Sequence, residues 1–397
     1  MKEPEAMTPR ERIKNAMDFK KVDSIPWVEG LGEELIMNFI SSGVPIQDVT
    51  AIEWGVCMDG FHLFNYPKVL GFDPYEYFGC INFTGCVVPV DIGPIPRFKQ
   101  RKIGAGPRYD EYVTETGALC RRFSKGTKVP TWYSMPQFYD FPVKDRTSWE
   151  KYKTRLNPED PRRYRKDWEK DAYMQVFEQY QGGPTTLGIT GFYGFGAELM
   201  GITNFVTSFY TNPELMHDMV SHWEYFTIET LRSAVESLKD RIDMVYWWED
   251  MAERHGPNIS PNLYREFLLP HCKNVTSFLN KNKINRIMLD SDGNIQPLLD
   301  LIIEAGITGQ WPLEVNAGMD VRTSRKLYGK KLFLGGNLDK EEIVKGGEAM
   351  RNEIDAKLPL MKETGGYFAG LDHDVPVSFT LERFHEYAAY LKNQLAM

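Results

Sequence analysis

Four short apolar runs in the last third of the chain each end at a polar residue. The runs are NRIMLDSDGN, ITGQWPLEV, KKLFLGGNLD and GGYFAGLDHD. The polar residues at their ends are Asp290 with Asp292, Glu314, Asn337 and His373. Helical patterns over 295–305, 321–328 and 340–363 separate the runs. Strands that alternate with helices at this spacing form right-handed βαβ units and a parallel sheet.

The same alternation runs through the rest of the chain. Strands are predicted near residues 25, 185, 244, 286, 307, 332 and 366, with an eighth inside 81–123. Thr8, Pro9 and Glu11 form a capping signal for a first helix that runs to about Phe19. Residues 31–80 look helical and irregular. Eight strands with intervening helices predict an α/β fold of the (β/α)8 TIM-like barrel type.

Residues 81–146 change character and indicate an insertion. INFTGCVVPVDI and DEYVTETGALCRRF, with the surrounding Gly and Pro, are typical of β-structure, and the best hairpin lies around Gly117. We therefore predict one barrel domain over 1–397 with an N-terminal-half insertion at about 81–180. No sequence repeat of 20–50 residues is found, so a solenoid is excluded.

Composition narrows the classes of function. Hydrophobic residues make up 42% and charged residues 26% of 397 residues, as in ordinary globular proteins. The net charge of −8 and the lack of a basic run with aromatics argue against nucleic acid as a ligand. No apolar stretch approaches the ~18 residues of a membrane span, and the charged N-terminus lacks a signal-peptide core. Five cysteines without a CxxC pair favour a reduced, cytoplasmic setting.

The polar strand ends are the candidate functional residues, because the carboxyl ends of barrel strands form the active-site face. Asp290 and Asp292 can bind a cation or share a proton. Alternatively, one of them caps the helix that begins near Ile295 while Gly293 supplies the turn. His373 can be a general acid/base or a metal ligand, or a structural or solvated histidine.

Other polar residues occupy similar positions. Glu249 and Asp250 follow the apolar run MVYWW, so one can face the pocket and the other a helix. Glu314 can be catalytic, can support the catalytic groups or can cap a helix, and Glu29 closes the first strand in a similar position. Asn337 follows two glycines that let a ligand approach the backbone. No phosphate loop, dinucleotide fingerprint, GxSxG elbow or HExxH motif is present.

In five stretches the chain resembles the uroporphyrinogen decarboxylase superfamily. They are TPRERIKNAMDFKKVDSIP, EDMAERHGPNISPNLYREFLLP, DSDGNIQPLLDLIIEAGITGQWPLEVNAGMDV, LYGKKLFLGGNLD and GGYFAGLDHDVPVSFTLERF. They occur in the family's order and cover about the first 30 and the last 160 residues. Residues 31–180 match nothing in the family. The resemblance implies a distorted (β/α)8 barrel, in agreement with the alternation of strands and helices.

The resemblance leaves two branches of function open. True uroporphyrinogen decarboxylases have an arginine-rich motif after the first strand, which holds the many carboxylates of their substrate. This chain has WVEGLGEELIM there, and Glu29, Glu33 and Glu34 would repel such a substrate. The other branch contains corrinoid-dependent methyltransferases. These move a methyl group between a methylated compound, a cobalamin on a small carrier protein, and a thiol or folate.

Members of that branch that act on coenzyme M hold zinc with a His-x-Cys-Gly motif at one strand end and a Cys near the final strand. This chain has Asp290-Ser291-Asp292-Gly293 and His373 in those regions, so the resemblance makes Asp290, Asp292 and His373 the expected zinc ligands. Oxygen and imidazole ligands leave zinc a harder Lewis acid, which suits the polarisation of a methyl ether oxygen. No DxHxxG segment is present, so cobalamin must arrive on a separate carrier protein.

We therefore predict a methyltransferase that acts on a methoxylated, aromatic-type compound and passes the methyl group to a corrinoid carrier protein. The predicted catalytic residues are Asp250, Glu249, Glu314 and Asn337. The predicted substrate-binding residues are Glu29, Phe192, Tyr193, Trp248 and Trp311. A cofactor-free decarboxylase, in which Asp290 or Asp250 protonates a carbanion-like intermediate, is the alternative, and a binding protein without catalysis is the third. The resemblance also implies a homodimer.

Overall fold

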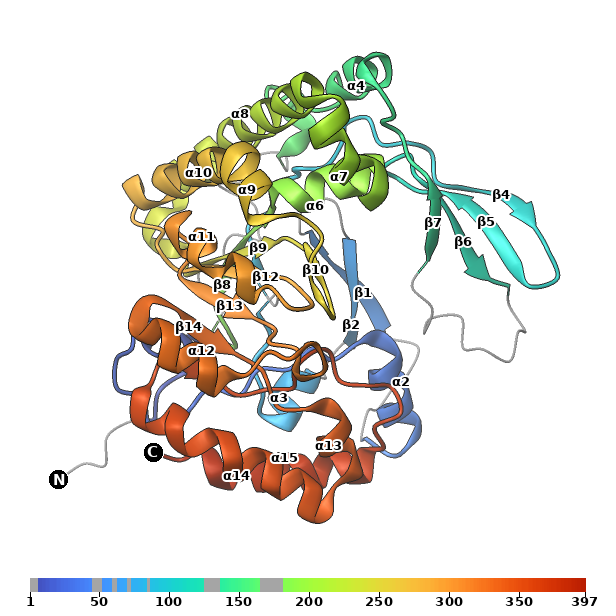
Figure 1. Ribbon diagram of the computed structural model, residues 1–397. Helices are drawn as coiled ribbons and strands as arrows, with labels where there is room; N and C mark the ends of the chain where they lie inside the picture. The colour runs from blue at the N-terminus through green and yellow to red at the C-terminus, as the bar shows by residue number, and fades with distance from the viewer. Residues whose placement is uncertain are drawn as a thin grey trace.

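The computed structural model describes residues 6–44, 52–58, 63–69, 73–83, 86–124, 136–164 and 181–397, with backbone alone for 52–58, 63–69 and residue 33. Its centre is a curled, parallel, seven-stranded sheet (Figure 1). In spatial order the strands are β15 (Tyr367–Phe368), β14 (Phe333–Gly335), β13 (Gly309–Trp311), β12 (Ile287–Asp290), β9 (Met244–Trp248), β8 (Thr185–Thr190) and β3 (Cys86–Val87). The predicted strand inside 81–123 is therefore β3.

A short segment near the N-terminus joins the two edges of this sheet. Trp27 forms a parallel bridge with Ala369, next to β15, and Val28 forms one with Ile81, five residues before β3. The strand predicted near residue 25 is thus present as isolated bridges. The curled sheet and its covering helices form a mixed α/β, TIM-like fold, as predicted.

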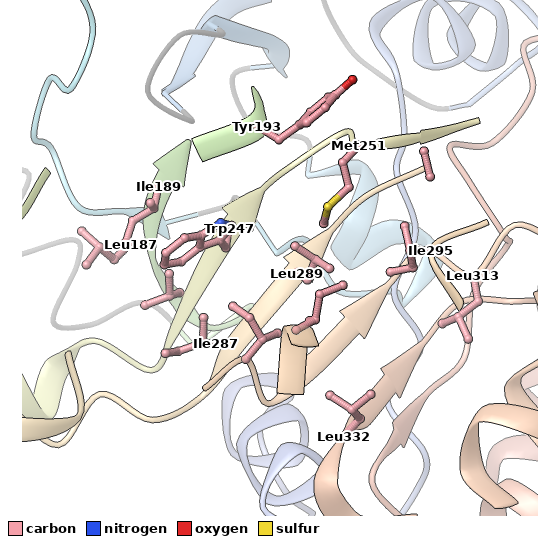
Figure 2. Packing of buried hydrophobic residues seen from close by; sticks show 14 of the residues in the cluster. Leu187, Ile189, Tyr193, Trp247, Met251, Ile287, Leu289, Ile295, Leu313 and Leu332 are labelled. Atoms are coloured by element: carbon pink, nitrogen blue, oxygen red, sulfur yellow. The ribbon is translucent and has the colours of Figure 1, made fainter. Parts of the chain in front are cut away.

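Side chains alternate between the two faces of the sheet, as β9 illustrates. Met244, Tyr246 and Trp248 belong to the cluster inside the sheet. Val245 and Trp247 belong to the larger cluster between the sheet and the helices. Figure 2 shows this outer cluster, with Trp247 among apolar side chains of the neighbouring strands. Successive side chains after β9 therefore point alternately toward the interior and toward the helices, so the position of a polar residue in this alternation decides which of the two it faces.

Helix α1 (Pro9–Met17) closes the amino end of the interior. It begins with the predicted capping box, in which the Thr8 hydroxyl accepts the N–H of Glu11. Its apolar face places Ile13 in the interior cluster with Met244 of β9. The polar residues that follow the strands lie at the opposite, carboxyl end.

The covering helices lie on opposite sides of the sheet (Figure 1). One side carries α6 (Phe192–Met200), α7 (Ile202–Thr211), α8 (Pro213–Leu238), α9 (Pro261–Leu263), a π-helical turn (Tyr264–Leu268) and α10 (Leu269–Lys281). The other carries α14 (Gly347–Thr364) and α15 (Leu381–Leu395). Between them in sequence lie α11 (Leu299–Glu304), α12 (Val321–Tyr328) and α13 (Lys340–Lys345). Among the described helices, none has the length and apolarity needed to cross a bilayer.

A four-stranded antiparallel sheet projects away from the central sheet (Figure 1). It consists of β4 (Arg101–Ala105), β5 (Tyr109–Val113), β6 (Leu119–Phe123) and β7 (Gln137–Asp140), followed by α4 (Arg146–Lys153). Strands β5 and β6 pair around Gly117, at the position of the predicted hairpin. The predicted end of the insertion falls on residues 165–180, outside the described residues.

A second hairpin lies where helical and irregular structure was predicted. Strands β1 (Ile52–Met58) and β2 (Leu63–Val69) pair antiparallel between α2 (Glu33–Ser41) and α3 (Pro74–Phe78). The prediction for this segment was wrong, because β-branched and aromatic residues in IEWGVCM and LFNYPKV favour strands.

Candidate metal and active site at the carboxyl ends of the strands

Polar groups from four successive strands meet at the carboxyl end of the sheet. Asp292 follows β12, Glu314 follows β13, Lys340 follows β14 and His373 follows β15. One ligand atom each of Asp292, Glu314 and His373 lies within 4.8 Å of the other two. Each of these three side chains is partly exposed, so a solute can reach them.

His373 and Asp292 are paired directly. The Nε2 atom of His373 lies 3.3 Å from Oδ2 of Asp292, and the backbone N–H of Asp374 donates to Nδ1 at 2.7 Å. The Asp292 carboxylate raises the pKa of His373 to about 9. In this arrangement Nδ1 accepts and Nε2 carries the proton that faces Asp292. A metal ligand must offer a lone pair, so a cation could bind Nε2 only by displacing that proton.

The turn after β12 positions both carboxylates. The N–H of Gly293 donates to Oε2 of Glu314 at 2.8 Å, and Oδ1 of Asp250 accepts the N–H of Asp292 at 3.1 Å. Gly293 has a φ of +77°, and a Cβ there would lie 2.6 Å from the carbonyl of Ala252. Gly293 therefore supplies the turn. The helical turn that follows begins at Gln296, whose N–H donates to Oδ1 of Asn294 at 3.1 Å, so neither aspartate caps it.

Asp290 lies deeper in the interior than Asp292. It is 7% exposed, and the Tyr246 hydroxyl donates to its Oδ2. In the strand register it stands between Trp248 of β9 and Trp311 of β13. Of the three predicted zinc ligands, the structure thus brings Asp292 and His373 together and places Asp290 outside the group. Glu314 takes the third position.

Glu249 faces the helices. It is 1% exposed; its Oε1 accepts the N–H of Tyr193 at 2.6 Å, and its Oε2 accepts the indole N–H of Trp247 at 2.9 Å. A Cβ at Gly191 would lie 1.0 Å from Oε2. Burial raises the pKa of Glu249 to about 7. Its carboxyl group therefore holds the start of α6, and the predicted catalytic role has no support from its position.

Glu29 is held in the same way as Glu249, at the end of the N-terminal segment in which Trp27 and Val28 form the isolated bridges. Its Oε1 accepts the indole N–H of Trp27 and the hydroxyl of Tyr387, both at 2.6 Å, and its Oε2 accepts the N–H of Leu371 at 3.3 Å. Both glutamates stand two residues after a tryptophan, in WVE and WWE. Glu29 thus anchors α15 to the sheet, away from the position expected of a substrate ligand.

The buried carboxyl of Glu29 should make stability depend on pH. Burial raises its pKa from 4.5 to about 7. Between these values the folded chain holds a proton that the unfolded chain releases, so the free energy of unfolding should fall as pH rises through this window. Glu29→Gln should remove about 2 kcal/mol of this fall between pH 5 and pH 8, measured by urea unfolding. Equal pH slopes in both proteins would contradict the prediction.

Asn337 is also used inside the protein. It is completely buried; its Oδ1 accepts the N–H of Val321 at 2.9 Å, and its Nδ2 donates to the carbonyls of Leu313 at 2.6 Å and Met319 at 3.0 Å. The side chain therefore fixes the segment after β13, which contains Glu314. Its position supports a structural role in place of the predicted catalytic one.

The aromatic residues predicted to bind substrate divide into two groups. Phe192 and Tyr193 are 1% and 0% exposed and pack in the outer cluster, where Figure 2 shows Tyr193. Trp248 and Trp311 are partly exposed and pack against the interior cluster, on either side of Asp290. The two tryptophans are therefore the predicted substrate-binding residues that lie near the candidate site.

Two residues of the site were not among the predicted ones. Asp372 is completely buried; its Oδ2 accepts the N–H of Val315 at 3.0 Å and its Oδ1 the N–H of Lys340 at 3.1 Å. Burial raises its pKa. The Lys340 ammonium lies 3.7 Å from Oε1 of Glu314. Asp372 directly precedes His373 in LDHD, and Lys340 stands three residues after Asn337 in NLDK; this nearness to the strand ends was the available signal.

A cavity of about 710 Å³ lies elsewhere, near the amino ends of the strands. Its lining includes Thr8, Trp27, Tyr75, Cys80 and Lys392, and none of the four strand-end residues Asp292, Glu314, Lys340 and His373. Active sites of barrel enzymes lie at the carboxyl face, whereas the opposite face serves stability. The strand-end cluster is therefore the better candidate site.

Comparisons with known proteins agree with this fold. The sequence profile of the family described as Uroporphyrinogen decarboxylase (URO-D) matches residues 172–393. Two proteins named uroporphyrinogen decarboxylase, from Pseudomonas fluorescens (strain Pf0-1) and Pseudomonas putida (strain W619), are 25% and 24% identical over 170 residues. These matches cover 42% of this chain and only 44% and 45% of the two relatives.

A solved structure is similar over nearly the whole chain. It is described as a methyltransferase from Methanosarcina mazei, with a TM-score of 0.56 and 15% sequence identity. The similarity covers 96% of this chain and 98% of that one. At this identity it shows a shared fold.

Proposed function

This chain belongs to the uroporphyrinogen decarboxylase family, and from that premise we propose that it is a methyltransferase of the corrinoid-dependent type. It would take a methyl group from a methoxylated compound, aromatic in our proposal, and pass it to a corrinoid on a separate carrier protein. The observation that carries the proposal is the group formed by Asp292, Glu314 and His373 at the strand ends. The fold that this chain shares with a methyltransferase also supports the proposal.

The three side chains suit a catalytic zinc ion. Two carboxylates and one imidazole are oxygen and nitrogen donors that zinc accepts, and three protein ligands leave a position open for substrate. When bound, a divalent cation would supply Lewis-acid polarisation of the ether oxygen. The Asp250 carboxylate holds the turn of Asp292 by accepting its backbone N–H, and the Gly293 N–H holds the Glu314 carboxylate by donating to it.

The interior beside this group suits an aromatic ring. Trp248 and Trp311 flank Asp290 on neighbouring strands, and their exposed faces can pack against a flat substrate. The ether's methyl carbon would pass to the reduced corrinoid, while the bonding pair of the broken C–O bond stays on the oxygen. The carrier protein would have to approach the carboxyl face of the sheet, where these groups lie.

Decarboxylation of a polycarboxylate is the weaker candidate, although the family and the two curated relatives carry that name. Carboxylates outnumber basic groups at these strand ends, where Asp250, Asp290, Asp292 and Glu314 are accompanied by Lys340 and His373. A substrate with many carboxylates would be repelled there.

Metal content and methyl transfer together test the proposal. Protein purified without chelator should contain about one zinc per chain by elemental analysis. It should also transfer methyl groups from methoxylated aromatic compounds to a reduced corrinoid, followed by the corrinoid absorption spectrum. Metal-free protein that releases CO₂ from a carboxylated substrate would contradict the proposal and support the decarboxylase.

A further inference from the structure

We propose that the Lys340 ammonium binds the oxygen atom from which the methyl group is removed, and so favours the anionic product over the ether. This inference rests on the proposed function and names the group that stabilises its leaving oxygen. It assigns a role to a residue that neither the strand-end pattern nor the predicted zinc ligands included.

The contacts of Lys340 leave its hydrogen-bonding capacity unused. Its side chain is 24% exposed, and its Nζ lies 3.7 Å from Oε1 of Glu314 and 3.9 Å from Oδ1 of Asp372. Both distances exceed a hydrogen bond. Within the described part of the chain, the ammonium therefore has two loose ion pairs and three donors that no acceptor closely approaches.

Two other lysines show how this chain normally satisfies an ammonium. Buried Lys357 lies 2.5 Å from Oε1 of Glu353 and donates to the carbonyl of Asn337. Exposed Lys345, at the other end of α13, lies 2.6 Å from Oε1 of Glu342. Lys340 has no such close partner, and its side chain is partly exposed, so its ammonium is open to solvent. A bound ligand that accepts from this ammonium would take the place of water and gain a charge-assisted hydrogen bond.

The position of Lys340 suits an oxygen that gains negative charge. Its ammonium stands next to Glu314, and its backbone N–H is fixed by Oδ1 of Asp372 at 3.1 Å. As the C–O bond breaks, its electron pair remains on the oxygen, and the carbon forms its new bond with the pair supplied by the reduced corrinoid. A fixed cation beside that oxygen stabilises the developing charge. Lys340 keeps its proton, and the released anion is protonated later by water.

A simpler role would be that Lys340 only balances the charges of Glu314 and Asp372. In that case its removal would disturb the carboxylates without any preference between an anion and a neutral ligand of the same shape. The two roles therefore differ in the ratio of two affinities, which can be measured without any corrinoid.

The test compares 4-nitrophenolate with its methyl ether, 4-nitroanisole, by equilibrium absorbance titration of zinc-containing protein. The unaltered chain should bind the phenolate more tightly than the ether, and one charge-assisted hydrogen bond from Lys340 should account for about tenfold of that ratio. Lys340→Met should lower the ratio about tenfold and leave the part that zinc contributes, and Lys340→Arg should keep most of it. Lys345→Met, on the same helix but outside the site, is the matched control and should leave it unchanged.

Zinc is measured in every variant, so that a lost metal is not mistaken for a lost ammonium. Lys340→Met with full zinc and an unchanged ratio would overturn the inference, and so would a ratio that falls only in proportion to lost zinc. A phenolate preference that depends on Lys340, in protein that transfers no methyl group, would contradict the proposed function but not the anion site. Methyl transfer by protein whose phenolate preference does not depend on Lys340 would contradict the anion site but not the proposed function.

Discussion

Replacement of Asp292 and His373 together by alanine should remove the bound metal and lower methyl transfer at least about a thousandfold. The double variant leaves Glu314 as one remaining side chain of the group of three, and one carboxylate does not hold a zinc ion in place. Lewis-acid polarisation contributes several kcal/mol, and each 1.36 kcal/mol corresponds to a factor of ten in rate. Elemental analysis and kcat/KM for methyl transfer measure the two effects.

Two further variants sharpen this test. Asp300→Ala/His385→Ala removes one exposed aspartate and one exposed histidine from helix surfaces and should change neither metal content nor rate. Asp290→Asn separates the two possible ligand sets. Retained zinc would support the set with Glu314, whereas lost zinc would support the set predicted from sequence. A double variant at Asp292 and His373 that keeps its zinc would contradict both.

Helices and strands could be predicted from the sequence where polar or turn-forming residues mark their ends. The strands predicted near residues 185 and 244 begin there as β8 and β9, and the helix predicted over 321–328 is α12, because Gly, Pro or charged residues mark these ends. Helices α6 and α7 follow each other with a break at Gly201, which has a φ of +72° and ends the first. Helix preference alone does not show such a break when apolar residues continue on both sides of it.

The candidate site could be predicted only down to the strand ends. Asp292 and His373 meet because both follow parallel strands of one sheet, and that rule needs no coordinates. The sequence left open which of Glu249 and Asp250 faces the interior. MVYWW is apolar on both faces, so its pattern does not show which of its side chains point inward. The structure resolves this choice: Trp247 and Glu249 share the outer face, and Asp250 contacts the turn of Asp292.

Buried polar residues were the main source of misplaced roles. A polar residue after a strand looks the same in sequence whether it binds a ligand or the backbone. In Glu29 and Glu249 the distinguishing signal was local, since a tryptophan two residues earlier supplies an indole N–H to each carboxyl group. For Asn337 the partners are 16 to 24 residues away, so no local signal existed.

Asn337→Ala should lower the free energy of unfolding by about 4 kcal/mol. The substitution leaves the N–H of Val321 and the carbonyls of Leu313 and Met319 buried without their partner, each at about 1–3 kcal/mol before relaxation. Asn337 also has a φ of +73°, which alanine adopts less readily than asparagine. Urea unfolding at constant pH measures the loss, and exposed Asn352→Ala on α14 is the control that should change little.

A comparison with Asn337→Gly separates the two causes. Glycine tolerates the positive φ but restores none of the hydrogen bonds, so it should recover less than about 1 kcal/mol of the loss. If Asn337 were instead a catalytic group, Asn337→Ala would keep its stability and lose activity. Because the side chain fixes the segment that carries Glu314, we expect stability and metal content to fall together.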